Sequence, residues 1–188
     1  GGADAAAGPS VEFELVPSTH TLLSPCCGRF VAVSPQGDRI VYEAAEEDGG
    51  LMLFQRRIDE REGRPIPGTE DARHPFFSPD GAWLGFFGND ELTIYKTRFD
   101  GGTPQRVADR VGSHPALGGA AWGPDNTIVF ADRGDAGLYR VSAEGGDPRP
   151  LTTLAEGDAS HRWPHVLPDG RTVLYSVSRT SSEVDLIR

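Results

Sequence analysis

A four-residue turn recurs four times along the chain at a nearly constant interval. The copies are Ser34-Pro35-Gln36-Gly37, Ser78-Pro79-Asp80-Gly81, Gly123-Pro124-Asp125-Asn126 and Leu167-Pro168-Asp169-Gly170, and they start 44, 45 and 44 residues apart. Proline presets the φ of the first central position, aspartate bonds its own backbone, and glycine supplies the positive φ that closes the turn. Gln36 and Asn126 depart from this pattern but are compatible with a turn.

Apolar segments flank every turn and predict a hairpin around it. Short apolar segments precede the turns (30–33, 76–77, 120–122, 166–167), and segments rich in β-forming residues follow them (40–42, 83–87, 127–130, 172–175). Third strands are expected at 51–58, 92–99 and 138–142, and short fourth strands at 64–66, 105–107 and 149–151. Four strands in about 44 residues, repeated, indicate the blades of a β-propeller.

We therefore predict an all-β propeller of about four four-stranded blades. Residues 1–10 are expected to be a flexible linker, and the repeats occupy about 11–67, 68–111, 112–156 and 157–188. The fourth repeat stops inside its third strand, at 185–188, so this blade is either incomplete or completed by the alternating segment Val11–Leu15. The sequence leaves open the native blade number and whether the fragment closes as a monomer or self-associates through open strand edges.

Charge and hydropathy exclude several classes of partner. The chain has 18 basic and 28 acidic residues, a net charge of −10, and no basic cluster, which argues against a nucleic-acid partner. It also lacks an apolar run long enough to insert this segment into a membrane. The adjacent Cys26 and Cys27 fit either small apolar side chains or a redox or cross-chain pair.

Large aromatic side chains recur at equivalent strand positions and are expected to pack between blades. They are Phe76, Phe77, Trp83, Phe86, Phe87, Trp122, Phe130 and Tyr175.

The motifs of catalysis are not found in the sequence. It contains no Gly-x-Ser-x-Gly elbow, no spacing that singles out a Ser-His-Asp triad, and none of the phosphate-loop, HRD or DFG motifs of a kinase. We predict no catalytic residue, no cofactor and no metal site in this chain.

Histidines gather in the segments that lead into the innermost strand of each blade, which meet at one mouth of a propeller channel. The candidate ligand-binding residues are Arg73, His74, His114, His161, Arg162 and Trp163. One interpretation is a pocket for an acidic peptide, a small anion or a transition metal. The other is that these side chains only orient the loops between blades. His161 and His165 have an i, i+4 spacing, but Pro164 between them argues against the helix that a metal pair would need.

The repeat resembles the Pro-Asp propeller repeats of the TolB type. More narrowly, the order of four motifs is similar to the propeller that lies C-terminal to bacterial serine/threonine protein kinases: 64–70 leading to 75–81, then 121–125, 151–153 and 160–164. The resemblance implies a kinase domain upstream and a sensor or protein-interaction role, on the extracytoplasmic side of a membrane-anchored protein. Two alternatives are the propeller of an oligopeptidase-like serine hydrolase and a free-standing TolB-like periplasmic scaffold.

Overall fold

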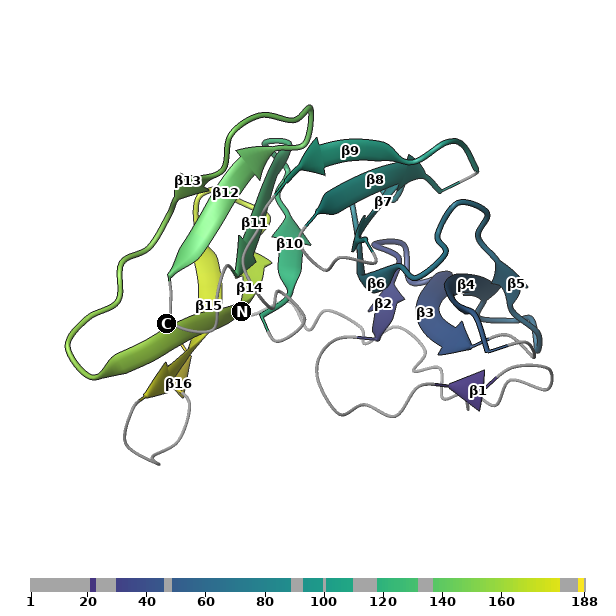
Figure 1. The fold of residues 1–188 in the computed structure, drawn as a ribbon, viewed down its shortest axis with the longest axis horizontal. Helices are drawn as coiled ribbons and strands as arrows, with labels where there is room; N and C mark the ends of the chain where they lie inside the picture. Colours follow the sequence, from purple (N-terminus) through teal and green to yellow (C-terminus); the bar gives the residue numbers. More distant parts are fainter. Residues whose placement is uncertain are drawn as a thin grey trace, which may run out of the picture.

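The computed structural model describes residues 21–22, 30–45, 49–88, 93–99, 101–109, 118–131, 137–179 and 186–187, whose regular secondary structure is entirely β-strand. The strands form four antiparallel sheets, each built from strands that are consecutive in the sequence. Figure 1 shows these sheets side by side along an arc. The strand that precedes each of the four turns, which we call the inner strand, lies toward the inner side of the arc. The predicted all-β propeller is therefore confirmed.

We call the sheets blades 1 to 4. Blade 1 contains β1 (Thr21–Leu22), β2 (Val31–Val33), β3 (Arg39–Ala45), β4 (Leu51–Arg57) and β5 (Arg64–Pro65). Blade 2 contains β6 (Arg73–Phe77), β7 (Trp83–Phe87), β8 (Ile94–Arg98) and β9 (Gln105–Ala108). Blade 3 contains β10 (Ala120–Trp122), β11 (Thr127–Ala131), β12 (Leu138–Ser142) and β13 (Arg149–Pro150), and blade 4 contains β14 (Asp158–Val166), β15 (Val173–Arg179) and β16 (Leu186–Ile187).

The strands follow the prediction closely, with one clear difference in blade 4. Its inner strand β14 starts at Asp158, although only 166–167 were predicted as strand. The pairing with β15 shifts register between Arg162 and His165, so that Pro164, which has no N–H, lies outside the ladder. The proline interrupts the sequence pattern of a strand, so the pattern did not predict this continuous but bulged strand. The predicted closing strand Val11–Leu15 lies outside the described residues.

The four turns share one backbone conformation. Their last residues, Gly37, Gly81, Asn126 and Gly170, have φ between 62° and 72°. Asn126 tolerates this left-handed conformation, and its side chain is held on both sides. Its carbonyl oxygen accepts a hydrogen bond from the Trp122 indole at 3.1 Å, and its amide donates to Glu144 at 3.2 Å.

The first turn has Gln36 where the other three turns have aspartate, and Asp38 accepts the serine hydrogen bond in its place. In blade 2, the Ser78 hydroxyl donates to Asp80, and this hydrogen bond lowers the pKa of the Asp80 carboxyl. In blade 1, the Ser34 hydroxyl donates instead to Asp38 at 2.8 Å and lowers its pKa in the same way. Gln36 is thereby free to reach the next blade, where its amide donates to the backbone oxygen of Asp80 at 3.0 Å.

Neighbouring blades bury apolar faces against each other. Between blades 1 and 2, Val41, Leu53 and Ile66 pack against Leu84, Phe86 and Phe99. Between blades 2 and 3, Phe76, Phe87 and Ile94 pack with Trp122, Ile128 and Phe130. Of the predicted aromatic residues, Phe76, Phe86, Phe87, Trp122 and Phe130 are buried, and Phe77 and Trp83 are half-buried against these two clusters. Tyr175 of blade 4 is half-buried against a third cluster, formed by Val129, Ala131 and Leu138 of blade 3.

In blades 1, 2 and 3, a small residue on one of the two innermost strands lies opposite a larger residue on the other. The register partners are Ala32 and Val41 in blade 1, Phe76 and Gly85 in blade 2, and Ala121 and Val129 in blade 3. A Cβ at Gly85 would overlap the Phe76 ring. Glycine is therefore required in blade 2 because its inner strand carries a large aromatic side chain.

This pairing makes a prediction for a double-mutant cycle. Gly85→Val should lower the free energy of unfolding by about 3 kcal/mol, because the valine overpacks against Phe76. Combining it with Phe76→Ala reproduces the alanine–valine pair of blades 1 and 3 and should cost less than the sum of the two single changes. Urea unfolding of the four proteins measures the coupling, and simple additivity would contradict this account.

Candidate functional site

The inner strands of the four blades line one groove. β2 packs against β6, β6 against β10, and β10 against β14, whereas the described residues of β2 and β14 are not packed together in this way. The groove has a volume of about 840 Å³ and is lined by Val31, Ala32, Val33, Pro35, Pro75, Phe76, Phe77, Ser78, Pro79, Ala120, Ala121, Trp122, Pro124, His165, Val166, Leu167 and Pro168. It corresponds to the inner side of the arc in Figure 1.

Apolar side chains dominate this groove. Val33 is 55% exposed, although valine is among the residues most often buried in proteins. Four prolines at equivalent turn positions, Pro35, Pro79, Pro124 and Pro168, add rigid apolar surface. Within the described part of the chain, each inner strand pairs along one edge only, with the second strand of its own blade. The groove therefore combines apolar side chains with strand edges.

Among the described residues that line the groove, His165 is the titratable side chain. It is exposed and occupies the position that Ala32, Phe76 and Ala121 occupy in the other blades. It was not among the six predicted ligand-binding residues. The sequence does carry a signal for it, because His165 lies three residues before its turn proline, as the three equivalent groove residues do.

The predicted site residues lie within or next to the inner strands. His74 and Trp163 are equivalent, five residues before the turn proline, and have φ of 52° and 55°. In blade 3 the same position is Gly119, with φ of 66°. Such backbone is uncommon for residues other than glycine and needs support from its surroundings.

His74 is supported from blade 1. Its backbone N–H donates to the buried Glu43 carboxylate at 2.5 Å, and its ring Nδ1 lies 3.7 Å from the same oxygen. The ring also meets Phe87 edge-on, with centroids 6.0 Å apart. His74 is only 5% exposed, so it joins blades 1 and 2 from inside the interface.

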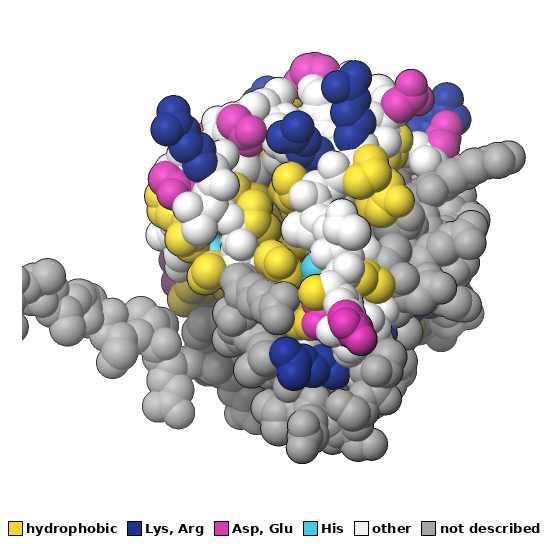
Figure 2. All heavy atoms as spheres, turned by 90° about the vertical axis from the view of Figure 1, so that its left-hand side faces the viewer, with side chains coloured by type: hydrophobic (Ala, Val, Ile, Leu, Met, Phe, Trp, Pro, Cys, Tyr) yellow, Lys and Arg dark blue, Asp and Glu magenta, His cyan; other side chains and the backbone are white. Residues whose placement is uncertain are grey.

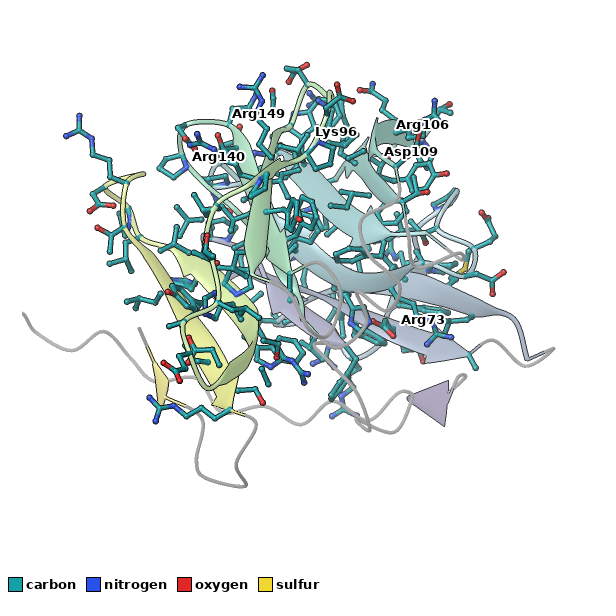
Figure 3. All side chains as sticks on the ribbon, turned by 60° about the vertical axis from the view of Figure 1, so that its left-hand side comes forward. Arg73, Lys96, Arg106, Asp109, Arg140 and Arg149 are labelled. Atoms are coloured by element: carbon teal, nitrogen blue, oxygen red, sulfur yellow. The ribbon has the colours of Figure 1, made fainter. Side chains whose placement is uncertain are left out.

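Trp163 makes the corresponding link between blades 3 and 4. Its backbone N–H donates a hydrogen bond to the Gly118 carbonyl oxygen at 2.7 Å. Its ring covers Gly119, where a Cβ would come within 2.9 Å of it. The neighbouring Arg162 donates from Nε to the Ser160 hydroxyl at 2.8 Å, and Arg73 is half-buried in β6, where Figure 3 labels it.

His161 belongs to a buried polar relay. Its Nδ1 lies 2.7 Å from the Thr152 hydroxyl and its Nε2 lies 3.4 Å from an Asp158 carboxylate oxygen. Thr152 also accepts the Leu138 N–H at 2.7 Å, so the relay ties blade 4 to β12 of blade 3. These residue types occur in hydrolase triads, but the His161 and Asp158 side chains are each 1% exposed. A substrate cannot reach these two buried side chains, and the hydrogen bonds act as a structural link between blades 3 and 4.

None of the described predicted residues (Arg73, His74, His161, Arg162 and Trp163) lines the groove, and His114 lies outside the described residues. A ligand site formed by these six residues stays a prediction.

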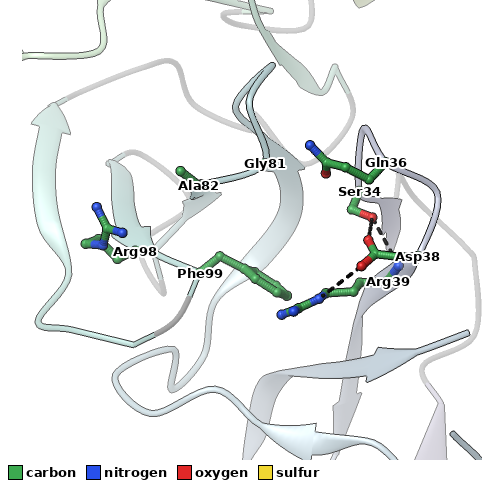
Figure 4. A pocket seen from close by; sticks show the side chains of 8 residues that line it. All are labelled: Ser34, Gln36, Asp38, Arg39, Gly81, Ala82, Arg98 and Phe99. Atoms are coloured by element: carbon green, nitrogen blue, oxygen red, sulfur yellow. Dashed lines mark hydrogen bonds and ion pairs between the residues drawn. The ribbon is translucent and has the colours of Figure 1, made fainter.

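A smaller pocket of about 310 Å³ lies where the first two turns meet (Figure 4). Ser34, Asp38 and Arg39 line it from blade 1, and Arg98 and Phe99 from blade 2. The Arg39 guanidinium lies 5.1 Å from the Phe99 ring centroid and 3.5 Å from the Asp38 carboxylate. These contacts hold Arg39 across the blade interface.

Two further searches were confined to the described segments. They contain no group of three His, Cys, Asp or Glu side chains that could hold a metal ion. They also contain no helix with the length and hydropathy to span a bilayer.

The relay predicts different roles for two histidines of one strand. His161→Leu should destabilise the fold by about 2–3 kcal/mol, because it leaves buried Asp158 and Thr152 groups without their partner. His165→Leu, on the exposed side of β14, should change stability by no more than about 0.5 kcal/mol. Thermal unfolding of both variants tests this, and equal effects would contradict a structural relay at His161.

Comparison with known proteins agrees with this geometry. No protein-family model matches the chain. It is similar in structure to the putative TolB of Agrobacterium tumefaciens, with a TM-score of 0.69 and 21% identity over 87% of this chain and 58% of that protein. TolB of Acinetobacter baumannii gives a TM-score of 0.69 and 19% identity over 85% of this chain and 40% of that protein.

One curated relative is a Bacillus subtilis protein described as the uncharacterized peptidase YuxL. It is 33% identical over 123 residues, which cover 58% of this chain and 18% of YuxL. The chain thus spans less than two thirds of the length of each of these relatives. Its fold is a TolB-like β-propeller.

Proposed function

We propose that this chain is a non-catalytic protein-interaction module, which binds an extended apolar segment of a partner polypeptide in the groove along β2, β6, β10 and β14. The observation that carries the proposal is that all four blades contribute apolar side chains to one open groove. Its volume of about 840 Å³ lies within the range of ligand sites, which is roughly 300–1,000 Å³.

The lining favours a polypeptide over a small charged ligand. The described residues that line the groove include no carboxylate, lysine or arginine side chain, so a charged ligand would lose hydration there without gaining an ion pair from them. Apolar side chains of a peptide would instead displace water from Val33, Phe77 and the turn prolines. The strand edges supply backbone groups for an extended chain.

The biological setting is proposed from the motif order described above. That order supports a propeller that senses or binds a protein ligand as part of a bacterial serine/threonine kinase, on the extracytoplasmic side of the membrane. A free-standing TolB-like scaffold would use the same groove.

A second candidate is the propeller of an oligopeptidase-like serine hydrolase. The YuxL match favours it, because that relative is described as a peptidase. The sequence of the parent gene separates the candidates: a kinase domain before Gly1 supports the sensor, and a hydrolase domain after Arg188 supports the peptidase.

A charge placed in the groove should weaken binding. Val33→Glu puts a carboxylate at a groove-lining position that is 55% exposed and should weaken binding of an apolar, proline-containing peptide by more than about tenfold. A synthetic array of such peptides identifies the ligand, and calorimetry measures its affinity for each variant.

Leu174→Glu is the matched control. Leu174 is 38% exposed on β15 and is not among the groove-lining residues, so this change should leave the affinity unaltered. The groove is not the binding site if Val33→Glu, folded as judged by circular dichroism, binds the peptide as tightly as the parent chain does.

A further inference from the structure

Two arginines lie opposite each other on the outer half of blade 3. Arg140 of β12 and Arg149 of β13 are direct register partners, so their side chains leave the same face of the sheet. Both are exposed, and they line a cavity of about 320 Å³ together with Ser142 and the turn Gly145–Gly146. Figure 3 labels both arginines at the upper end of the molecule, and Figure 2 shows charged side chains gathered at that end above a more apolar middle.

A negative charge bound between the two guanidinium groups would stabilise this arrangement. Like charges on directly opposed strand residues repel each other. The equivalent pairs are Gln55 with Arg64 in blade 1 and Lys96 with Gln105 in blade 2, so each of them carries a single cation. In the described part of the chain, no carboxylate forms an ion pair with Arg140 or Arg149.

Blade 2 shows what such a position binds. Lys96 occupies the place in β8 that Arg140 occupies in β12, judged by its register with the neighbouring strands. Its Nζ lies 3.1 Å from the Glu144 carboxylate and 4.9 Å from the Trp83 ring centroid, and the residue is 5% exposed. Glu144 stands in the Glu-Gly-Gly turn of the adjacent blade, and the hydrogen bond from Lys96 lowers its pKa.

We propose that Arg140 and Arg149 together bind a carboxylate carried by an acidic, glycine-containing turn of a partner polypeptide, in the way that Lys96 binds Glu144. Two guanidinium groups on one face can donate several hydrogen bonds to one carboxylate. Asp147 also lines the cavity, and its negative charge favours a singly charged carboxylate over a phosphate dianion. The site lies on the outer strands, so it is independent of the groove.

The chain itself supplies a suitable probe. A synthetic peptide of residues 138–147 carries the turn with Glu144, and nuclear magnetic resonance of the arginine Nε–H groups reports its binding to the 188-residue chain. The peptide should shift the Arg140 and Arg149 signals. Replacing Glu144→Gln in the peptide should weaken binding by at least about tenfold, because only the charge is removed.

Variants of the chain separate this site from general electrostatic attraction. The double variant Arg140→Gln with Arg149→Gln should lose binding of the peptide. Arg106→Gln is the matched control, since Arg106 is an exposed arginine on the outer strand of blade 2 that pairs with Asp109 at 3.0 Å (Figure 3). This control should bind the peptide like the parent chain.

Any one of several results would overturn the proposal. The first is unchanged peptide binding by the double variant, or equal binding of the Glu144→Gln peptide. The second is tighter binding of inorganic phosphate than of the peptide at the two arginines, which would make this an oxyanion site. The third is self-association, seen by light scattering and lost in the double variant, which would make the partner a second copy.

Discussion

The inner strand of a blade has to bend where it passes the preceding blade, and one left-handed residue makes that bend. His74, Gly119 and Trp163 hold this position in blades 2, 3 and 4. The strain is tolerable because the bend lies inside an interface: the His74 N–H is bonded to Glu43 of blade 1, and the Trp163 N–H to Gly118 of blade 3. Blade packing and strand bending therefore stabilise each other.

The groove is a consequence of that arrangement. Each inner strand pairs with one neighbour in its own blade, so in the described segments its other edge is directed to the inner side of the arc. The side chains that stabilise the blades, such as Phe87 and Phe130, are buried between them, whereas Val33 and the turn prolines stay at the groove surface. The exposed Arg106, Arg140 and Arg149 lie on the outer half of blades 2 and 3 and are not among the residues that line this apolar surface.

The period of the turns predicted the blades and nearly all of their strands, because turn chemistry and strand patterning are local properties. The hydrogen bond from Gln36 to the backbone of Asp80, 44 residues away, and the support of His74 by Glu43, 31 residues away, depend on contacts between blades and have no local signal. His74, His161 and His165 lie in inner strands, but a one-dimensional pattern does not tell the buried His161 from the exposed His165. The pairing of β14 with β15 shifts register between Arg162 and His165, so two histidines of one strand differ in burial.

Hydrogen exchange with and without the bound peptide tests the central claim most directly. If the four inner strands form one binding surface, the ligand should slow amide exchange in 31–35, 75–79, 120–124 and 165–168 together and leave the outer strands β5, β9 and β13 unchanged. Protection limited to a single blade, or found on the outer strands instead, would contradict a groove shared by all four blades.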